Sequence, residues 1–220
     1  MKSSTKHFCA AGGLLAAFAL WTLVLGFVDV KAIGPQGSTV GFATVNGFVH
    51  GLTGVHMPLY TITDWLGLVP IGFCMGFAVL GLIQWIARKG LARVDDSLFV
   101  LGGFYIVVMA AYLFFETVTV NARPVLINGY LETSYPSSTT LLVLCVMPTA
   151  AMQLRGRIRN IPCRRWACGA LWAFTTFMVV GRLLSGVHWV TDIVGGGLLS
   201  AGLVRLYRGA ILWREHKKAL

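Results

Sequence analysis

The chain has 220 residues, of which 56% are hydrophobic and only 12% are charged, and its mean hydropathy is +0.75. A soluble domain of this size cannot bury that much apolar surface, so the composition excludes a soluble globular protein and indicates an integral membrane protein. The formal net charge of +10 would suit an acidic partner, but the distribution of the basic residues favours another explanation.

Six apolar runs are long enough to cross a bilayer as helices, which takes about 20 residues each. They are 8–28, 65–87, 98–120, 137–154, 166–184 and 188–207. The first run is long for the apolar part of a signal peptide and lacks a clear cleavage site, so we interpret it as a membrane helix. No repeat or low-complexity linker divides the chain. The sequence therefore predicts an all-α bundle of six transmembrane helices, forming a single domain over residues 1–220.

The basic residues indicate the orientation of this bundle. With six spans, every Lys and Arg except Lys31, Arg123 and Arg182 falls on one side of the membrane. This positive-inside pattern predicts that both termini are cytoplasmic, in a bacterial-type plasma membrane. The arginine-rich connection 155–165 fits that signal and contact with anionic headgroups, and we expect no nucleic-acid partner.

The longest connection on the opposite side covers residues 29–64 and is rich in glycine and small residues. It predicts a short interfacial helix or a lid over the end of the bundle. His50 and His56 fall here, where polar histidines at the headgroup level are expected.

Three ionisable residues gather in the stretch GRLLSGVHWVTD, residues 181–192. His188 and Asp192 are four residues apart, so on a helix they would share a face, and the carboxylate would orient the imidazole. Arg182 has a guanidinium group, which stays charged and can form bidentate hydrogen bonds with two phosphate oxygens. The alternative is that Arg182 reaches the membrane interface and the other two residues cap a helix.

A second outer connection brings further anion-binding groups. It contains Arg123 and then YPSSTT, in which Pro136 interrupts the chain before the fourth apolar run. This pattern predicts that Ser137, Ser138 and Thr139 lie at a helix N-terminus, where free N–H groups and the helix dipole favour an anion. Two arginines, a helix start and a His–Asp pair suit a phosphate ester.

These stretches resemble the three motifs of the type 2 phosphatidic acid phosphatases (PAP2), which are K-x6-R-P, P-S-G-H and S-R-x5-H-x3-D. The third motif reads GRLLSGVHWVTD, with Gly181 in place of the serine. The first reads ETVTVNARP, with Glu116 in place of the lysine. The second reads PSST, with Ser138 in place of the glycine and Thr139 in place of the histidine.

The resemblance implies a role for each matching residue. His188 would attack phosphorus to form a phosphohistidine and Asp192 would orient it, with no metal or cofactor. Arg123, Arg182 and Ser137, with the backbone of Ser138 and Thr139, would hold the phosphoryl oxygens. In the family the second-motif histidine protonates the leaving alcohol, which a threonine cannot do, and losing a general acid costs about 10²- to 10⁴-fold in rate. Glu116 would repel phosphate unless it is protonated or paired with an arginine.

Three functions remain open at the level of sequence. The favoured one is a lipid phosphatase acting at the extracytoplasmic face, with a phosphatidate-like lipid or a polyprenyl diphosphate as its substrate. A diphosphate needs little protonation of its leaving group, and otherwise Glu116, Glu132, His50, His56 or water would replace the missing acid. The alternatives are a phosphotransferase of the same architecture and a non-catalytic protein that binds or translocates lipid phosphates. The sequence does not define an oligomeric state.

Overall fold

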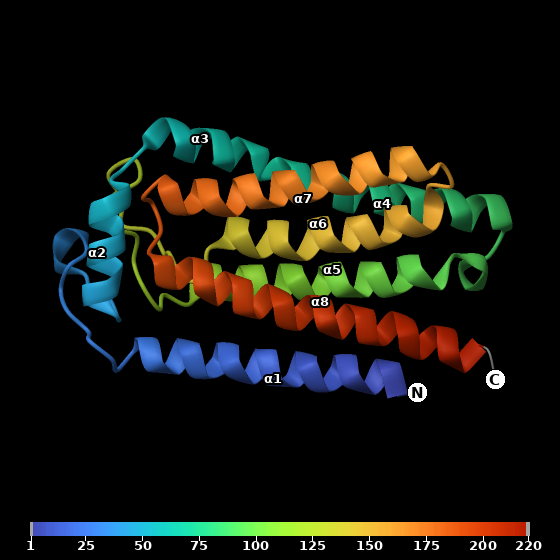
Figure 1. The fold of residues 1–220 in the computed structure, drawn as a ribbon, viewed down its shortest axis with the longest axis horizontal. Coiled ribbons are helices and arrows are strands. Elements are labelled where there is room, and N and C mark those ends of the chain that lie inside the picture. Colours follow the sequence, from blue (N-terminus) through green and yellow to red (C-terminus); the bar gives the residue numbers. More distant parts are fainter. Residues whose placement is uncertain (1, 219–220) are drawn as a thin grey trace.

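The computed structural model describes residues 2–218, a chain of helices joined by loops. Its α-helices are α1 (Lys2–Leu25), α2 (Ala43–Thr53), α3 (Met57–Leu66), α4 (Leu68–Arg88), α5 (Asp96–Thr117), α6 (Ser138–Arg157), α7 (Ile161–Leu184) and α8 (Val190–Lys218). The long helices run side by side along one axis, with both chain ends at one end of the bundle and α2 across the other (Figure 1). The predicted all-α bundle is confirmed.

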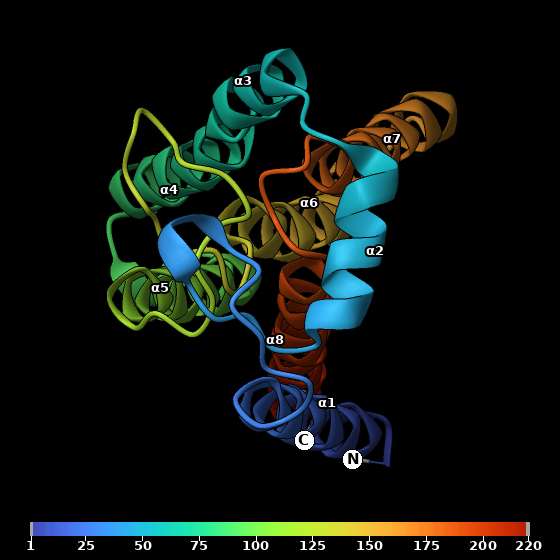
Figure 2. The same ribbon diagram turned by 90° about the vertical axis from the view of Figure 1, so that its left-hand side faces the viewer.

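Five segments are long and apolar enough to cross a membrane. They are Ser3–Leu25, Met57–Arg88, Asp96–Thr117, Ile161–Leu184 and Val190–Lys218. The sixth predicted span corresponds to α6, which lies in the middle of the bundle when viewed from its end (Figure 2) and contacts α4, α5, α7 and α8. The count of apolar spans is lower than predicted because α6 faces protein and carries buried polar side chains such as Thr149 and Gln153.

Two of the predicted helix boundaries differ clearly from those observed. The second span begins at Met57, eight residues before the predicted run, because α3 continues almost directly into α4 across Gly67. The last helix extends to Lys218, well beyond residue 207, because its final turns are polar and basic and carry no hydrophobic signal. Helices therefore continue past the apolar part of the sequence on which the prediction depended.

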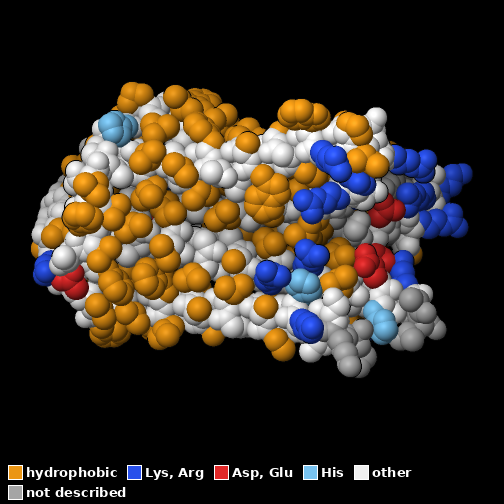
Figure 3. Space-filling view, viewed as in Figure 1, with side chains coloured by type: hydrophobic (Ala, Val, Ile, Leu, Met, Phe, Trp, Pro, Cys, Tyr) orange, Lys and Arg blue, Asp and Glu red, His pale blue; other side chains and the backbone are white. Residues whose placement is uncertain are grey.

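The surface of the bundle matches a lipid environment. On the face shown in Figure 3, apolar side chains cover the length of the helices, while Lys and Arg side chains gather at the end that holds both chain termini. Large apolar side chains such as those of Ile106, Met75 and Leu20 are exposed. In a membrane protein, such side chains face lipid tails instead of water.

The α2 helix closes the end of the bundle opposite to the chain termini. Asn46 of α2 is fully buried, and its amide nitrogen donates to Gly41 O at 2.8 Å and contacts Thr191 Oγ1 at 3.0 Å. Thr191 N donates in return to Asn46 Oδ1 at 3.3 Å. The predicted helix over the bundle is therefore present, and these hydrogen bonds fix it to the first turn of α8.

Three glycines of α8, Gly195, Gly202 and Gly209, allow close packing, whereas Gly197 is free of contact, so the helix offers a matched test of the packing. A methyl group on Gly195 would lie 2.4 Å from Tyr135 Cε2, whereas one on Gly197 would meet nothing within 4 Å. We expect Gly195→Ala to destabilise the fold by roughly 1–3 kcal/mol and Gly197→Ala to leave it unchanged or slightly more stable. Thermal unfolding of both variants in detergent tests this, and equal melting temperatures would contradict the packing.

Candidate active site

His188 lies in the turn between α7 and α8, and only 3% of the residue is exposed. The prediction that His188 and Asp192 share a helical face was wrong, because α8 begins at Val190 and His188 precedes it. Gly186 permits the turn: its φ is +69°, and a methyl group there would lie 1.9 Å from Gly54 O. The histidine therefore lies on a tight connection buried beneath neighbouring loops.

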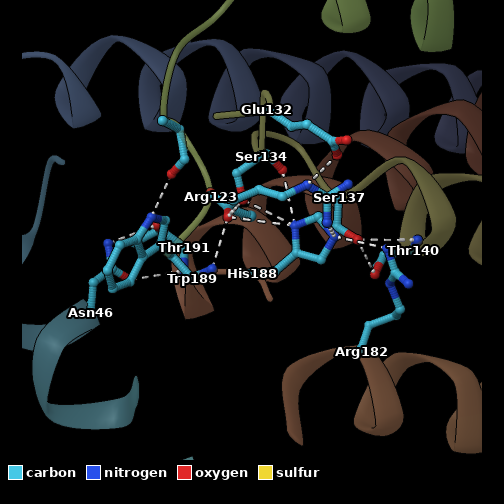
Figure 4. Close-up of polar contacts among 12 residues, drawn as sticks. Asn46, Arg123, Glu132, Ser134, Ser137, Thr140, Arg182, His188, Trp189 and Thr191 are labelled. Atoms are coloured by element: carbon cyan, nitrogen blue, oxygen red, sulfur yellow. Dashed lines mark hydrogen bonds and ion pairs between the residues drawn. The ribbon is translucent and has the colours of Figure 1, made fainter. Parts of the chain in front are cut away.

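Two arginines from distant parts of the chain converge on the same nitrogen of His188. Arg182 Nη2 lies 3.2 Å from His188 Nε2, and Arg123 Nη1 lies 3.4 Å from it. Figure 4 shows both guanidinium groups on one side of the imidazole ring. A guanidinium can only donate hydrogen bonds, so Nε2 is the accepting nitrogen, with its lone pair directed toward the two arginines. The proton of the neutral ring therefore belongs on Nδ1.

Ser134 holds the opposite nitrogen of the ring. Its hydroxyl lies 3.1 Å from His188 Nδ1 and donates to Asp192 Oδ2, and its carbonyl oxygen lies 3.2 Å from the same nitrogen. Asp192 Oδ2 itself is 3.7 Å from Nδ1, too long for the direct hydrogen bond that the sequence predicted. The serine hydroxyl fills the space between them, so Nδ1–H, Ser134 and Asp192 form a relay.

Asp192 also stabilises the beginning of α8. Its Oδ2 accepts a hydrogen bond from Trp189 N at 2.8 Å, as a carboxylate in the first turn of a helix commonly does. The capping interpretation that the sequence left open is therefore correct for Asp192, alongside its contact with Ser134. The cap fixes the carboxylate relative to the histidine turn.

Burial and two neighbouring cations control the charge of His188. Desolvation, followed by the repulsion of Arg123 and Arg182, holds the pKa of the imidazole well below its usual value. The ring is therefore neutral at neutral pH. A neutral imidazole with an unprotonated Nε2 is the form that can act as a nucleophile.

The two arginines retain hydrogen-bonding capacity although they are buried. Arg182 is 1% exposed; its Nε has no hydrogen-bond partner among the described residues, and its Nη1 is paired with Asp64 Oδ1 at 3.5 Å. Arg123 Nε forms an ion pair with Glu132 Oε2 at 3.1 Å. The ring of Tyr60 lies against both guanidinium groups, 5.0 Å from Arg182 Cζ and 5.9 Å from Arg123 Cζ. Buried donors without partners are costly unless an anion occupies the site.

The second-motif residues begin α6 as predicted but have different surroundings. Ser137 caps the helix, since its hydroxyl accepts from Thr140 N at 3.4 Å, and its own N–H donates to Asp192 O at 3.2 Å. Its hydroxyl oxygen also accepts from Thr140 Oγ1 at 3.0 Å, and in both contacts the hydroxyl accepts, so direct contact of its O–H with phosphate stays a prediction. Ser138 lines a small pocket beside His188, and Thr139 is buried.

The structure also places Glu116, His50 and His56, three of the residues considered as replacements for the missing acid. Glu116 lines the same pocket as His188 and is exposed, consistent with the spacing of the first motif. His50 packs against the ring of Trp189, and His56 Nε2 contacts Thr53 O at 2.9 Å. His56 is therefore hydrogen-bonded, whereas His50 lies in α2 with a buried Nδ1 that has no hydrogen-bond partner among the described residues.

Sequence reasoning missed three residues of this site. Ser134 stands just before the second motif, and Tyr60 and Asp64 lie in a segment taken largely as a loop. The available signal was a tyrosine and an aspartate four residues apart before the second apolar run, which places them on one face if the helix starts early.

Ser134 offers a direct test of the relay. We expect Ser134→Ala to lower the turnover of the proposed reaction about 10- to 100-fold, since one hydrogen bond to a charged group contributes about 1.5–3 kcal/mol. The folded state should persist, because the alanine leaves the backbone contact of Ser134 O with Nδ1 in place. Steady-state kinetics and thermal unfolding check this, and an unchanged turnover would exclude a role for the relay.

The fold and the site together define a helical membrane protein with a buried histidine beside two arginines. Residues 98–215, more than half of the chain, match the family model of the PAP2 superfamily. The chain therefore belongs to the PAP2 superfamily, as its motifs indicated.

A comparison with solved structures agrees with this assignment. The chain is similar to the crystal structure of a transmembrane PAP2-type phosphatidylglycerolphosphate phosphatase from Bacillus subtilis, with a TM-score of 0.51 and 18% sequence identity. The alignment covers 94% of this chain and 96% of that one. At this identity the likeness concerns the fold. A search of curated proteins found no match.

Proposed function

We propose that the protein is a lipid phosphatase that works through a phosphohistidine on His188, without a metal ion. The observation that carries this proposal is the position of His188 Nε2, which is 3.2 Å and 3.4 Å from the guanidinium groups of two arginines while Nδ1 is held by Ser134. A phosphate group bound by these arginines would lie directly in front of the attacking lone pair.

The reaction follows from this geometry. The lone pair of Nε2 attacks phosphorus, and the bond from phosphorus to the ester oxygen breaks with its electron pair. The imidazole gains positive charge, which the relay through Ser134 to Asp192 stabilises. Arg123 and Arg182 balance the negative charge of the phosphoryl oxygens. Water then attacks the phosphohistidine and returns the neutral ring and free phosphate.

The substrate is proposed to be a lipid phosphate monoester or a polyprenyl diphosphate. The site lies near one end of the apolar bundle, where a headgroup meets the polar loops while its chains stay among the helices (Figure 1). Phosphatidic acid represents the monoesters. Phosphatidylglycerol phosphate is a second monoester to test, because the similar solved structure is of an enzyme named for it.

We further propose that the site opens to the extracytoplasmic side of the plasma membrane. The support is the distribution of charge: Lys and Arg gather at the end of the bundle that holds both chain termini, opposite to the end at which α7 is joined to α8 (Figures 1 and 3). Under the positive-inside rule that end is cytoplasmic. Labelling of single cysteines introduced near each end, with a reagent that cannot cross membranes, tests the orientation.

The experiment that tests the function is phosphate release by purified protein in detergent from phosphatidic acid and from a polyprenyl diphosphate. Release from either lipid, together with incorporation of labelled phosphate into protein, is expected. Transfer of the phosphoryl group to an added alcohol in preference to water would identify a phosphotransferase instead. Lipid binding without phosphate release would identify a binding protein and overturn the proposal.

A further inference from the structure

The departing alcohol of a phosphate monoester needs a proton, and the chain has threonine where the family motif has histidine. Thr139 is buried at the start of α6. A methyl group built on Gly67 would lie 3.7 Å from Thr139 Cγ2, which places Thr139 beside the turn that joins α3 to α4. The residues of that turn are therefore neighbours of the position that lacks an acid.

Asp64 lies in the last turn of α3, three residues before Gly67, and it contacts the candidate phosphate site through Arg182. Asp64 Oδ1 lies 3.5 Å from Arg182 Nη1, while Nη2 of the same guanidinium lies 3.2 Å from His188 Nε2. One edge of the guanidinium thus faces both the attacking nitrogen and the carboxyl group. Asp64 has a side chain that is 56% exposed, so a substrate entering from the polar end can meet it.

The other two acidic residues near the site are less well placed. Glu132 pairs with Nε of Arg123, whereas Nη1 of that arginine faces His188. Glu116 lines a small pocket with Ser134, Ser138 and His188, but among the described residues no ion pair joins it to Arg123 or Arg182. Asp64 alone of these three lies on the guanidinium edge that faces Nε2.

We propose that Asp64 is the general acid of this enzyme, donating a proton to the leaving oxygen in place of the absent histidine. This inference rests on the proposed phosphatase function. It adds a catalytic residue from α3, outside the segment that matches the family model, residues 98–215.

The reaction forms one bond to phosphorus and breaks one in each of its two steps. The bond from Nε2 to phosphorus forms, the ester P–O bond breaks, and the leaving oxygen takes the carboxyl proton of Asp64. In the second step the carboxylate takes a proton from the attacking water, whose oxygen joins phosphorus as Nε2 departs. The proton that Asp64 donates in the first turnover comes from the phosphate group of the substrate, since a phosphate monoester has its second pKa at about 6.

The test compares substrates with different leaving groups. Asp64→Asn and the matched control Glu132→Gln each remove one carboxylate that pairs with a phosphate-site arginine. Initial rates of phosphoenzyme formation are measured with phosphatidic acid, whose leaving group is an alkoxide, and with a polyprenyl diphosphate, whose leaving group is already a weak base. Asp64→Glu serves as the conservative replacement, and thermal unfolding in detergent verifies that each variant is folded.

Asp64→Asn is expected to slow the reaction of phosphatidic acid about 10²- to 10⁴-fold and that of the diphosphate less than about 10-fold. Glu132→Gln is expected to change both rates by the same factor, and Asp64→Glu to recover part of the phosphatidic acid rate. Equal losses on both substrates in Asp64→Asn would overturn the assignment and leave Asp64 a partner of Arg182. Wild-type protein that forms no phosphoenzyme with either lipid would refute the proposed function itself, a separate result.

Discussion

Replacing His188 by alanine is expected to lower phosphate release by a factor on the order of 10⁴ to 10⁶, the loss typical of removing a nucleophile. The reason is geometric, because His188 Nε2 is the nitrogen on which both buried arginines converge. The measurement is phosphate release from phosphatidic acid and a polyprenyl diphosphate, together with trapping of labelled phosphate on the protein.

The label itself discriminates between mechanisms. A phosphohistidine is labile to acid and stable to base, so the trapped label should disappear on acid treatment and be absent from His188→Ala. His216, in the last turn of α8 at the other end of the bundle, provides the control, since His216→Ala should retain wild-type rates. Full activity of His188→Ala would rule out this histidine as the nucleophile.

Replacing Arg182 by alanine is expected to lower kcat/KM about 10²- to 10³-fold, the scale for losing one preorganised donor to a developing anion. Arg182 Nε is buried with no hydrogen-bond partner in the described part of the chain, so it is available to a phosphate oxygen, while Nη1 is paired with Asp64 at 3.5 Å. Arg182→Lys keeps the charge but not the planar pair of donors, and should recover only part of the loss.

The matched control for Arg182 is an arginine outside the site. Arg165, near the start of α7, is exposed at the end of the bundle that holds the chain termini, and Arg165→Ala should leave kcat/KM unchanged. Steady-state kinetics over a range of substrate concentrations separate the effects on kcat and KM. A loss that is equal in Arg165→Ala and Arg182→Ala would point to a general effect of charge and would contradict specific phosphate binding.

Much of the fold was predictable because membrane helices can be recognised in a sequence by their length and hydropathy. The apolar runs located the helices, α6 among them, although α6 is not one of the five segments apolar enough to be recognised as spans, and α3 was missed as the beginning of its span. Both differences have one cause. High hydropathy indicates side chains that contact lipid. The α6 helix is instead surrounded by protein, and α3 carries the polar side chains of Tyr60 and Asp64, which contact Arg182.

The sequence by itself determined the membrane class and the family and predicted four ionisable residues of the candidate site, because the spacing of Arg123, Arg182, His188 and Asp192 matches the motifs. Only the tertiary structure decided how these groups meet. Ser134 came between His188 and Asp192, and Asp64 reached Arg182 from a helix about 120 residues away along the chain. Hydrogen bonds and ion pairs depend on distances of a few ångströms between segments, and only the packing of the helices sets those distances.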